Sequence, residues 1–182
     1  MLAKSSKNVL NRAMVNQSKT AMATGGQKLA LVDEESKHRH KLPLYELAPR
    51  TENNWIAPNA TVIGEVILRK WSTVWYNAVI RGDINAVEVQ NFTSIGENTV
   101  IHTASALPTG MPAKTYIGRN CTIGAGCTIY SAHIDDDVVV GDKAVVLEGA
   151  RLEKGCEIAP GSVVPPGRLI PSKQLWAGNP VQ

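Results

Sequence analysis

A large aliphatic residue recurs every six positions along most of this chain. Neither the helical period of about 3.6 residues nor the strand alternation of 2 produces this spacing. A six-residue period is typical of a parallel β-helix, in which neighbouring coils stack and bury each other's aliphatic column. The positions are Ile56, Val62, Leu68, Val74, Ile80, Val89, Ile95, Ile101, Ile117, Ile123, Ile129, Ile134, Val140, Val146, Leu152, Ile158, Val164 and Ile170, with Trp176 as an aromatic last member.

Small residues follow four positions after many of these aliphatic residues, and we expect them to point inward as well. All three cysteines, Cys121, Cys127 and Cys156, occupy this position, which favours buried thiols that pack as small hydrophobic groups. Metal ligation or a redox pair is the alternative. Glycine often follows the aliphatic position directly, as at Gly96 and Gly124, and predicts a corner that needs backbone freedom.

The six-residue period is interrupted in three places. One interruption lies between Ile80 and Val89, and the second is the insertion of residues 103–114 directly after His102. The third is a one-residue deletion beside Tyr130. Because all three flank His102, we expect function or assembly in that region.

Charge is distributed unevenly along the chain. Five of its 19 basic residues precede the first acid, Asp33, which leaves 14 basic and 16 acidic residues in the remainder. This mild acidity gives no support to a nucleic-acid surface. No apolar run approaches the roughly 20 residues that span a bilayer, so we expect no transmembrane segment.

The residues before the period differ in composition. Residues 1–24 are basic, free of acids and rich in Ser, Asn and Ala, as in a mitochondrial presequence; a polar tail is the alternative. We therefore predict an N-terminal extension over residues 1–54, with a docking arm after the presequence-like tail, and a β-helix domain over residues 55–182. The apolar residues that could anchor this arm on another surface are Leu42, Leu44, Tyr45 and Leu47.

Several stretches carry a family resemblance. They are IAPNATVIG (56–64), VWYNAVIRGD (74–83), NTVIH (98–102), TIG (122–124) and AGNP (177–180). Together, over about two-thirds of the chain, they resemble the γ-class carbonic anhydrases. Members of that family are trimers of left-handed β-helices that hold zinc with three histidines at each subunit interface. The resemblance therefore implies an all-β, left-handed parallel β-helix.

The zinc ligands of that family are incomplete in this chain. His102 matches the first ligand, whereas Ala125 and Tyr130 stand where the other two histidines are expected. A catalytic zinc needs about three protein ligands and an open position for water. Alanine offers no donor atom, and a phenol keeps its proton at neutral pH. Gly96 also replaces a glutamine that orients the active-site solvent in the family.

These departures predict that the chain is not an enzyme. We expect no catalytic residue, no metal and no cofactor in the chain itself, with His102 as the remnant of a metal site. In the family, two ligands come from one subunit and the third from its neighbour, so zinc is possible only at an interface between intact partner subunits. Arg81 and Asp83 match a pair that joins subunits in the family, which implies a trimer-interface role; two exposed loop charges are the alternative.

The resemblance and the N-terminal composition together imply a cellular role. The chain is similar to the non-catalytic subunits of a γ-carbonic-anhydrase heterotrimer on the matrix face of the mitochondrial inner membrane. That heterotrimer is attached to the membrane arm of respiratory complex I, the NADH:ubiquinone oxidoreductase of electron transport. The expected partners are therefore other γ-carbonic anhydrase subunits and membrane-arm subunits.

Two enzyme hypotheses stay open beside this one. The chain could be a divergent active carbonic anhydrase, or a hexapeptide-repeat acyltransferase with His102 as general base beside the inserted segment. His133 is a candidate replacement ligand because it lies near Tyr130 in sequence. His38 and His40 are predicted to be solvent-exposed.

Overall fold

The described part of the chain consists of short strands joined by turns. The structure, a computed structural model, describes residues 39–44, 46–107, 110 and 112–182. These residues form nineteen strands, β1–β19, and no helix. No helix able to cross a membrane is therefore present among them. The presequence-like segment 1–24, His38 and Tyr45 lie outside the described residues.

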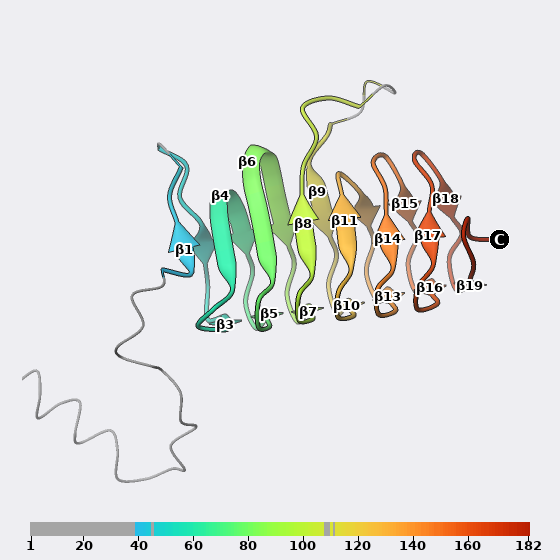
Figure 1. Cartoon of the computed structure of the whole chain (residues 1–182), viewed down its shortest axis with the longest axis horizontal. Helices are drawn as coiled ribbons and strands as arrows, with labels where there is room; N and C mark the ends of the chain where they lie inside the picture. The colour runs from blue at the N-terminus through green and yellow to red at the C-terminus, as the bar shows by residue number, and fades with distance from the viewer. Residues whose placement is uncertain (1–38, 45, 108–109, 111) are drawn as a thin grey trace, which may run out of the picture. The chain divides into compact units, whose positions relative to one another are not determined.

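Most of the strands wind around a three-sided coil (Figure 1). Face 1 contains β8 (Val100–His102), β11 (Thr128–Tyr130), β14 (Val145–Val146) and β17 (Val163–Val164). Face 2 contains β9 (Thr115–Ile117), β12 (His133–Ile134), β15 (Arg151–Leu152) and β18 (Leu169–Ile170). Face 3 contains β3 (Trp55–Ile56), β5 (Thr73–Val74), β7 (Ser94–Ile95), β10 (Thr122–Ile123), β13 (Val139–Val140), β16 (Glu157–Ile158) and β19 (Leu175–Trp176). Each strand pairs in parallel with the strand of the next coil, which confirms the predicted parallel β-helix.

Two longer strands bend around the corner between faces 1 and 2. They are β4 (Thr61–Leu68) and β6 (Val79–Val89), which pair with a register shift after Gly64. The predicted interruption between Ile80 and Val89 is thus one continuous strand. The short strands β1 (Lys41–Leu42) and β2 (Arg50–Thr51) pair with β4, so part of the predicted docking arm joins the coils of its own chain. The division at residue 54 itself stays a prediction.

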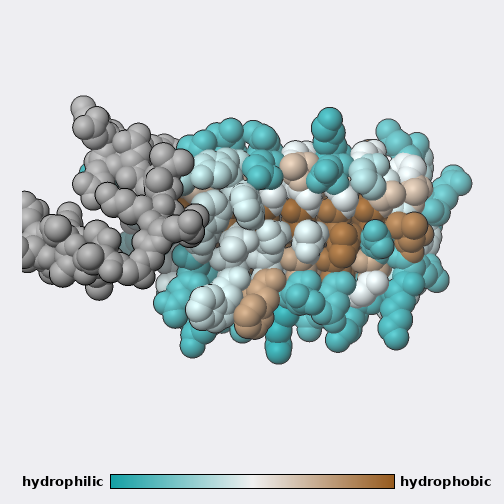
Figure 2. Space-filling model, turned by 90° about the horizontal axis from the view of Figure 1, so that it is seen from below, coloured by the Kyte–Doolittle hydropathy of each residue, from teal (hydrophilic) through white to brown (hydrophobic). Residues whose placement is uncertain are grey.

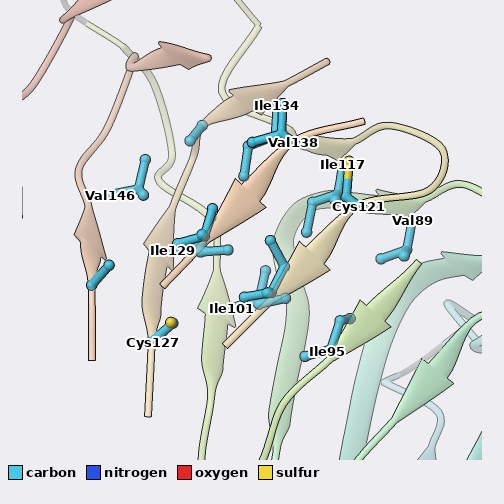
Figure 3. Packing of buried hydrophobic residues seen from close by; sticks show 14 of the residues in the cluster. Val89, Ile95, Ile101, Ile117, Cys121, Cys127, Ile129, Ile134, Val138 and Val146 are labelled. Atoms are coloured by element: carbon cyan, nitrogen blue, oxygen red, sulfur yellow. The ribbon is translucent and has the colours of Figure 1, made fainter. Parts of the chain in front are cut away.

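The aliphatic positions of the six-residue period form the core. All of them from Val62 to Ile170 are buried, and the end members Ile56 and Trp176 pack half-buried against them. Figure 3 shows Ile101, Ile129 and Cys127 among the side chains that fill this interior. Fully burying one isoleucine contributes roughly 1.5–3 kcal/mol. Stability therefore comes from stacked coils rather than from any single strand.

Close packing between coils explains the glycines that follow aliphatic positions. We predicted unusual backbone angles there, but neither Gly96 nor Gly124 has a left-handed φ. A Cβ atom on Gly96 would lie 2.6 Å from the carbonyl carbon of Gly124 in the next coil. One on Gly124 would lie 2.5 Å from Oδ1 of Asp142. The cause that we predicted for these glycines was wrong: the neighbouring coil leaves no room for a side chain.

Candidate functional site

His102 and Tyr130 lie one coil apart at the end of face 1. They are register partners across β8 and β11, and their rings stack with centroids 4.2 Å apart and 21° between the planes. Each follows a buried isoleucine, so the strand alternation turns both side chains outward. The structure thus brings together the first and third of the predicted ligand positions.

Arg81 and Asp83 reach this pair from the preceding coil. Ile80 of β6 pairs with Ile101, which places Arg81 beside His102. Arg81 donates a hydrogen bond to Asp83 of the same chain, and this contact lowers the pKa of the carboxyl group. Burial lowers the pKa of His102, and the charge of Arg81 lowers it further. Both effects favour the neutral imidazole, and Asp83 opposes them.

Ala125 lies at a different corner, in the turn that follows β10. Its backbone N–H donates to Oδ1 of Asp142 over 2.8 Å, and its methyl group offers no donor atom. Gly96 packs on the same turn, because a Cβ there would lie 2.8 Å from the nitrogen of Ala125. The position of the family's glutamine has no space for a side chain here. The three ligand positions, His102, Ala125 and Tyr130, do not fit a zinc site, because only His102 carries an ordinary zinc donor.

The inserted segment after His102 is anchored on both sides. Ser131 Oγ accepts a hydrogen bond from Ala104 N over 2.6 Å and donates one to the Ala113 carbonyl over 2.7 Å. Asn85, on the preceding coil, donates from Nδ2 to the carbonyl of Ala104 over 2.6 Å. The described residues of this segment project from the corner between β8 and β9 (Figure 1).

Tyr130 supports the base of the inserted segment. Ala104, Leu107 and Ala113 form a small buried cluster, and Tyr130 packs half-buried against it. The phenol is thus held by the His102 ring and by this apolar cluster. The residue at the third predicted ligand position thus makes packing contacts within its own chain.

The other two described histidines lie away from this stack. His133 lies on face 2, where its ring stacks on Tyr116 with centroids 4.8 Å apart and its Nε2 contacts Asp135 Oδ1 over 2.9 Å. It is therefore engaged on another face, and its role as a replacement ligand gains no support. His40 is half-buried rather than exposed as predicted.

The cysteines are buried in the core, as the six-residue register predicted. Burial raises the pKa of the Cys121 thiol to about 11 and that of Cys156 to about 11. All three remain free thiols. Within the described ranges of this single chain, no group of three or more His, Cys, Asp or Glu side chains is placed to hold a metal ion.

Sequence reasoning missed two residues that organise this region. Ser131 and Asn85 fix the inserted segment through side-chain hydrogen bonds, and neither belongs to the six-residue period. A signal for Ser131 does exist, because it directly follows Tyr130 at the one-residue deletion, where a corner must be closed. Asn85 has no comparable signal, since its partners are backbone carbonyls 19 and 20 residues away.

Comparison with known proteins gives relatives of two kinds. No protein-family model matches the chain. Gamma carbonic anhydrase 2, mitochondrial, of Arabidopsis thaliana is 38% identical over 88 residues, which are 48% of this chain and 32% of that protein. Gamma carbonic anhydrase-like 1, mitochondrial, of the same plant is 39% identical over 85 residues, 46% of this chain and 34% of that protein. The chain thus spans about a third of the length of these curated relatives.

A solved structure aligns over much more of the chain. The crystal structure of a hexapeptide transferase family protein from Anaplasma phagocytophilum has a TM-score of 0.72 and 34% identity, and covers 78% of this chain and 81% of that one. The chain belongs to the hexapeptide-repeat family. This confirms the predicted all-β, left-handed parallel β-helix. The homologues of this hexapeptide-repeat protein include γ-class carbonic anhydrases and carbonic-anhydrase-like proteins, as the motifs indicated.

Proposed function

We propose that this chain is a non-catalytic structural subunit of a γ-carbonic-anhydrase-type heterotrimer. The packing of Tyr130 between His102 and the base of the inserted segment carries this proposal. Together with Ala125, it leaves two of the three ligand positions unsuited to zinc. An interface between two copies of this chain then lacks a three-histidine site. Any zinc and any CO2 hydration belong to an interface between intact partner subunits.

Face 1 offers a surface on which partner subunits can pack. Its outward column from Val79 to Val163 contains no charge, whereas the columns of faces 2 and 3 include Glu88, Arg151 and Glu157. Removing water from an uncharged strand surface costs little free energy when another subunit covers it. The column runs beside the His102–Tyr130 stack, and its half-buried members are Val79, Val100, Thr128, Val145 and Val163.

A charge placed in this column tests the assembly. We expect Val145→Lys to abolish co-purification with γ-carbonic anhydrase partners when the chains are co-expressed, because it buries an unpaired ammonium group in the interface. Val139→Lys is the matched control on face 3, where Val139 is 40% exposed, and it should keep the partners. Equal retention of partners by both variants would contradict packing on face 1.

We further propose that the heterotrimer is mitochondrial and attached to the membrane arm of complex I on the matrix side of the inner membrane. The mitochondrial names of the homologues and the presequence-like composition of residues 1–24 support this location. Native electrophoresis of solubilised mitochondrial membranes with mass spectrometry of each band is the test. The chain should migrate with complex I. Its presence only in a band of trimer size would exclude the attachment.

An acyltransferase is the second candidate function, and one observation favours it. Burial lowers the pKa of the His102 ring, which favours the neutral imidazole, and among the described side chains none hydrogen-bonds its nitrogens, so it can accept a proton. The hexapeptide transferase family name of the Anaplasma protein points the same way. Turnover of acetyl-CoA by the purified chain, lost in His102→Ala, would establish this function and replace the structural one.

A further inference from the structure

The corner between faces 2 and 3 holds one left-handed residue in each coil. Asparagine, aspartate and glycine tolerate this conformation, whereas a bulky side chain in it is a steric outlier. Two of the occupants are nevertheless aromatic. In order, the column is Asn53, Trp71, Phe92, Asn120, Asp137, Gly155 and Lys173, with φ between 49° and 70°.

Trp71 and Phe92 gain little from packing in return for this strain. Each side chain is 62% exposed. They lie in adjacent coils, since the backbone N–H of Phe92 donates to the carbonyl of Lys70. A strained and exposed aromatic pair at a turn tip is a feature for which the fold itself supplies no reason.

Basic side chains accompany the aromatic pair. Lys70 directly precedes Trp71, and Arg119 precedes the next member of the column, Asn120. Lys70 and Arg119 border a common open hollow of about 390 Å³. In the part of the chain that the structure describes, neither side chain forms an ion pair, whereas Arg69 beside them pairs with Glu52 and Glu88. The backbone N–H of Arg119 donates to Asp136, and Glu52 also lines the hollow. We name Lys70, Trp71, Phe92 and Arg119 the aromatic–basic corner.

An aromatic surface continues from this corner onto face 3. Trp71 and Trp55 line a second hollow of about 530 Å³. Trp55 in turn meets Trp75 and Tyr76 edge to face, with ring centroids 5.2 and 5.9 Å away. Figure 2 looks onto the side of face 3 and shows a hydrophobic band between hydrophilic edges, which is strongest in the coils away from the aromatic–basic corner. The corner is thus the rim of a partly apolar face.

We propose that the aromatic–basic corner docks on a membrane surface that contains anionic phospholipids. Tryptophan and phenylalanine insert shallowly at the boundary between headgroups and acyl chains. Lysine and arginine are attracted to anionic headgroups at the same depth. A turn tip presents side chains outward from the protein, which suits insertion into a lipid interface. The column becomes acidic at Asp137, one coil beyond Arg119, and this limits the docking surface to the first coils.

Binding of the purified full-length chain to vesicles tests this proposal without any partner subunit, so its outcome is independent of the assembly role. Sedimentation should show binding to vesicles of equal parts phosphatidylcholine and phosphatidylglycerol. Trp71→Asn with Phe92→Asn should weaken this binding at least about tenfold. Lys70→Gln with Arg119→Gln should weaken it by about fivefold per charge, and only on the anionic vesicles.

Two controls separate docking from folding. Asparagine already occupies this corner at positions 53 and 120, so the double asparagine variant should keep or raise the thermal unfolding midpoint. Leu175→Asn removes a side chain that is 65% exposed on the last strand of face 3, and it should bind vesicles as the wild type does.

Two results would overturn membrane docking. The wild-type chain could fail to bind anionic vesicles, or the double asparagine variant could bind them as tightly as the wild type. In the latter case another part of the chain, such as the basic segment before Asp33, carries the binding. Loss of self-association in the asparagine variant, with vesicle binding unchanged, would instead identify the corner as a contact between copies of the chain.

Discussion

His102 has surroundings that keep its imidazole neutral. Tyr130 covers one face of the ring, and the positive charge of Arg81 acts on it from the preceding coil. Asp83 opposes that effect, but its carboxylate is already engaged by Arg81. A solitary neutral histidine can accept a proton, yet it cannot by itself hold a catalytic zinc.

The ionisation of His102 is directly measurable. We expect an NMR titration to give His102 a pKa below the ordinary histidine value of about 6.5. Because the unfolded chain then binds the proton more tightly, the free energy of unfolding should fall as the pH drops from about 6.5 through the folded-state pKa. His102→Gln should remove this part of the pH dependence. Arg81→Gln should raise the pKa of His102, and a pKa unchanged in that variant would contradict the electrostatic explanation.

Gly96 tests the close packing between coils. Gly96→Ala should lower the free energy of unfolding by about 1–3 kcal/mol, because its Cβ would meet the backbone of Gly124. Gly126→Asn is the matched control. Gly126 has a left-handed φ, and the nearest atom to a Cβ there is 3.5 Å away. Asparagine already occupies the equivalent turns at Asn77 and Asn98. Urea denaturation measures the free energy of unfolding of both variants. Similar losses in the two variants would refute the steric explanation.

The strands of the core could be predicted from sequence because one aliphatic side chain per strand is enough to mark them. The bend of β4 and β6 could not, because it depends on the close approach of Gly64 and Gly82 across two coils. The six-residue period likewise predicted where His102, Ala125 and Tyr130 lie in the coils, but it did not predict which residues surround them. The stack on Tyr130 and the hydrogen bonds of Ser131 arise from contacts between segments that the pattern leaves unrelated.

The inserted segment should loosen when Ser131 is replaced. Ser131→Ala leaves the N–H of Ala104 and the carbonyl of Ala113 without their buried partner, which should cost about 1–3 kcal/mol. Hydrogen exchange should show faster exchange of the Ala104 amide. Ser105→Ala, in an exposed position of the same segment, should change neither quantity. Unaltered protection of Ala104 in Ser131→Ala would contradict a role of the Ser131 hydroxyl in holding the segment.

The coils together form a scaffold with distinct surfaces rather than a single site. One outward column of face 1, from Val79 to Val163, is uncharged, while Arg81 and Asp83 lie next to the His102–Tyr130 stack. The first coils carry exposed aromatic side chains on face 3 and at its corner. The six-residue period predicted the scaffold, and the motifs predicted its relatives. The aromatic–basic corner could not be predicted, because the left-handed angles of Trp71 and Phe92 become visible only when the turns are placed in the coil.

Zinc content is the most direct test of a non-catalytic subunit. The purified chain, analysed by inductively coupled plasma mass spectrometry after equilibration with zinc and desalting, should retain far less than one zinc per chain and should not accelerate CO2 hydration. His102→Ala should leave both results unchanged. Retention of about one zinc per chain together with CO2 hydration, both lost in His102→Ala, would show instead that this chain builds a working metal site.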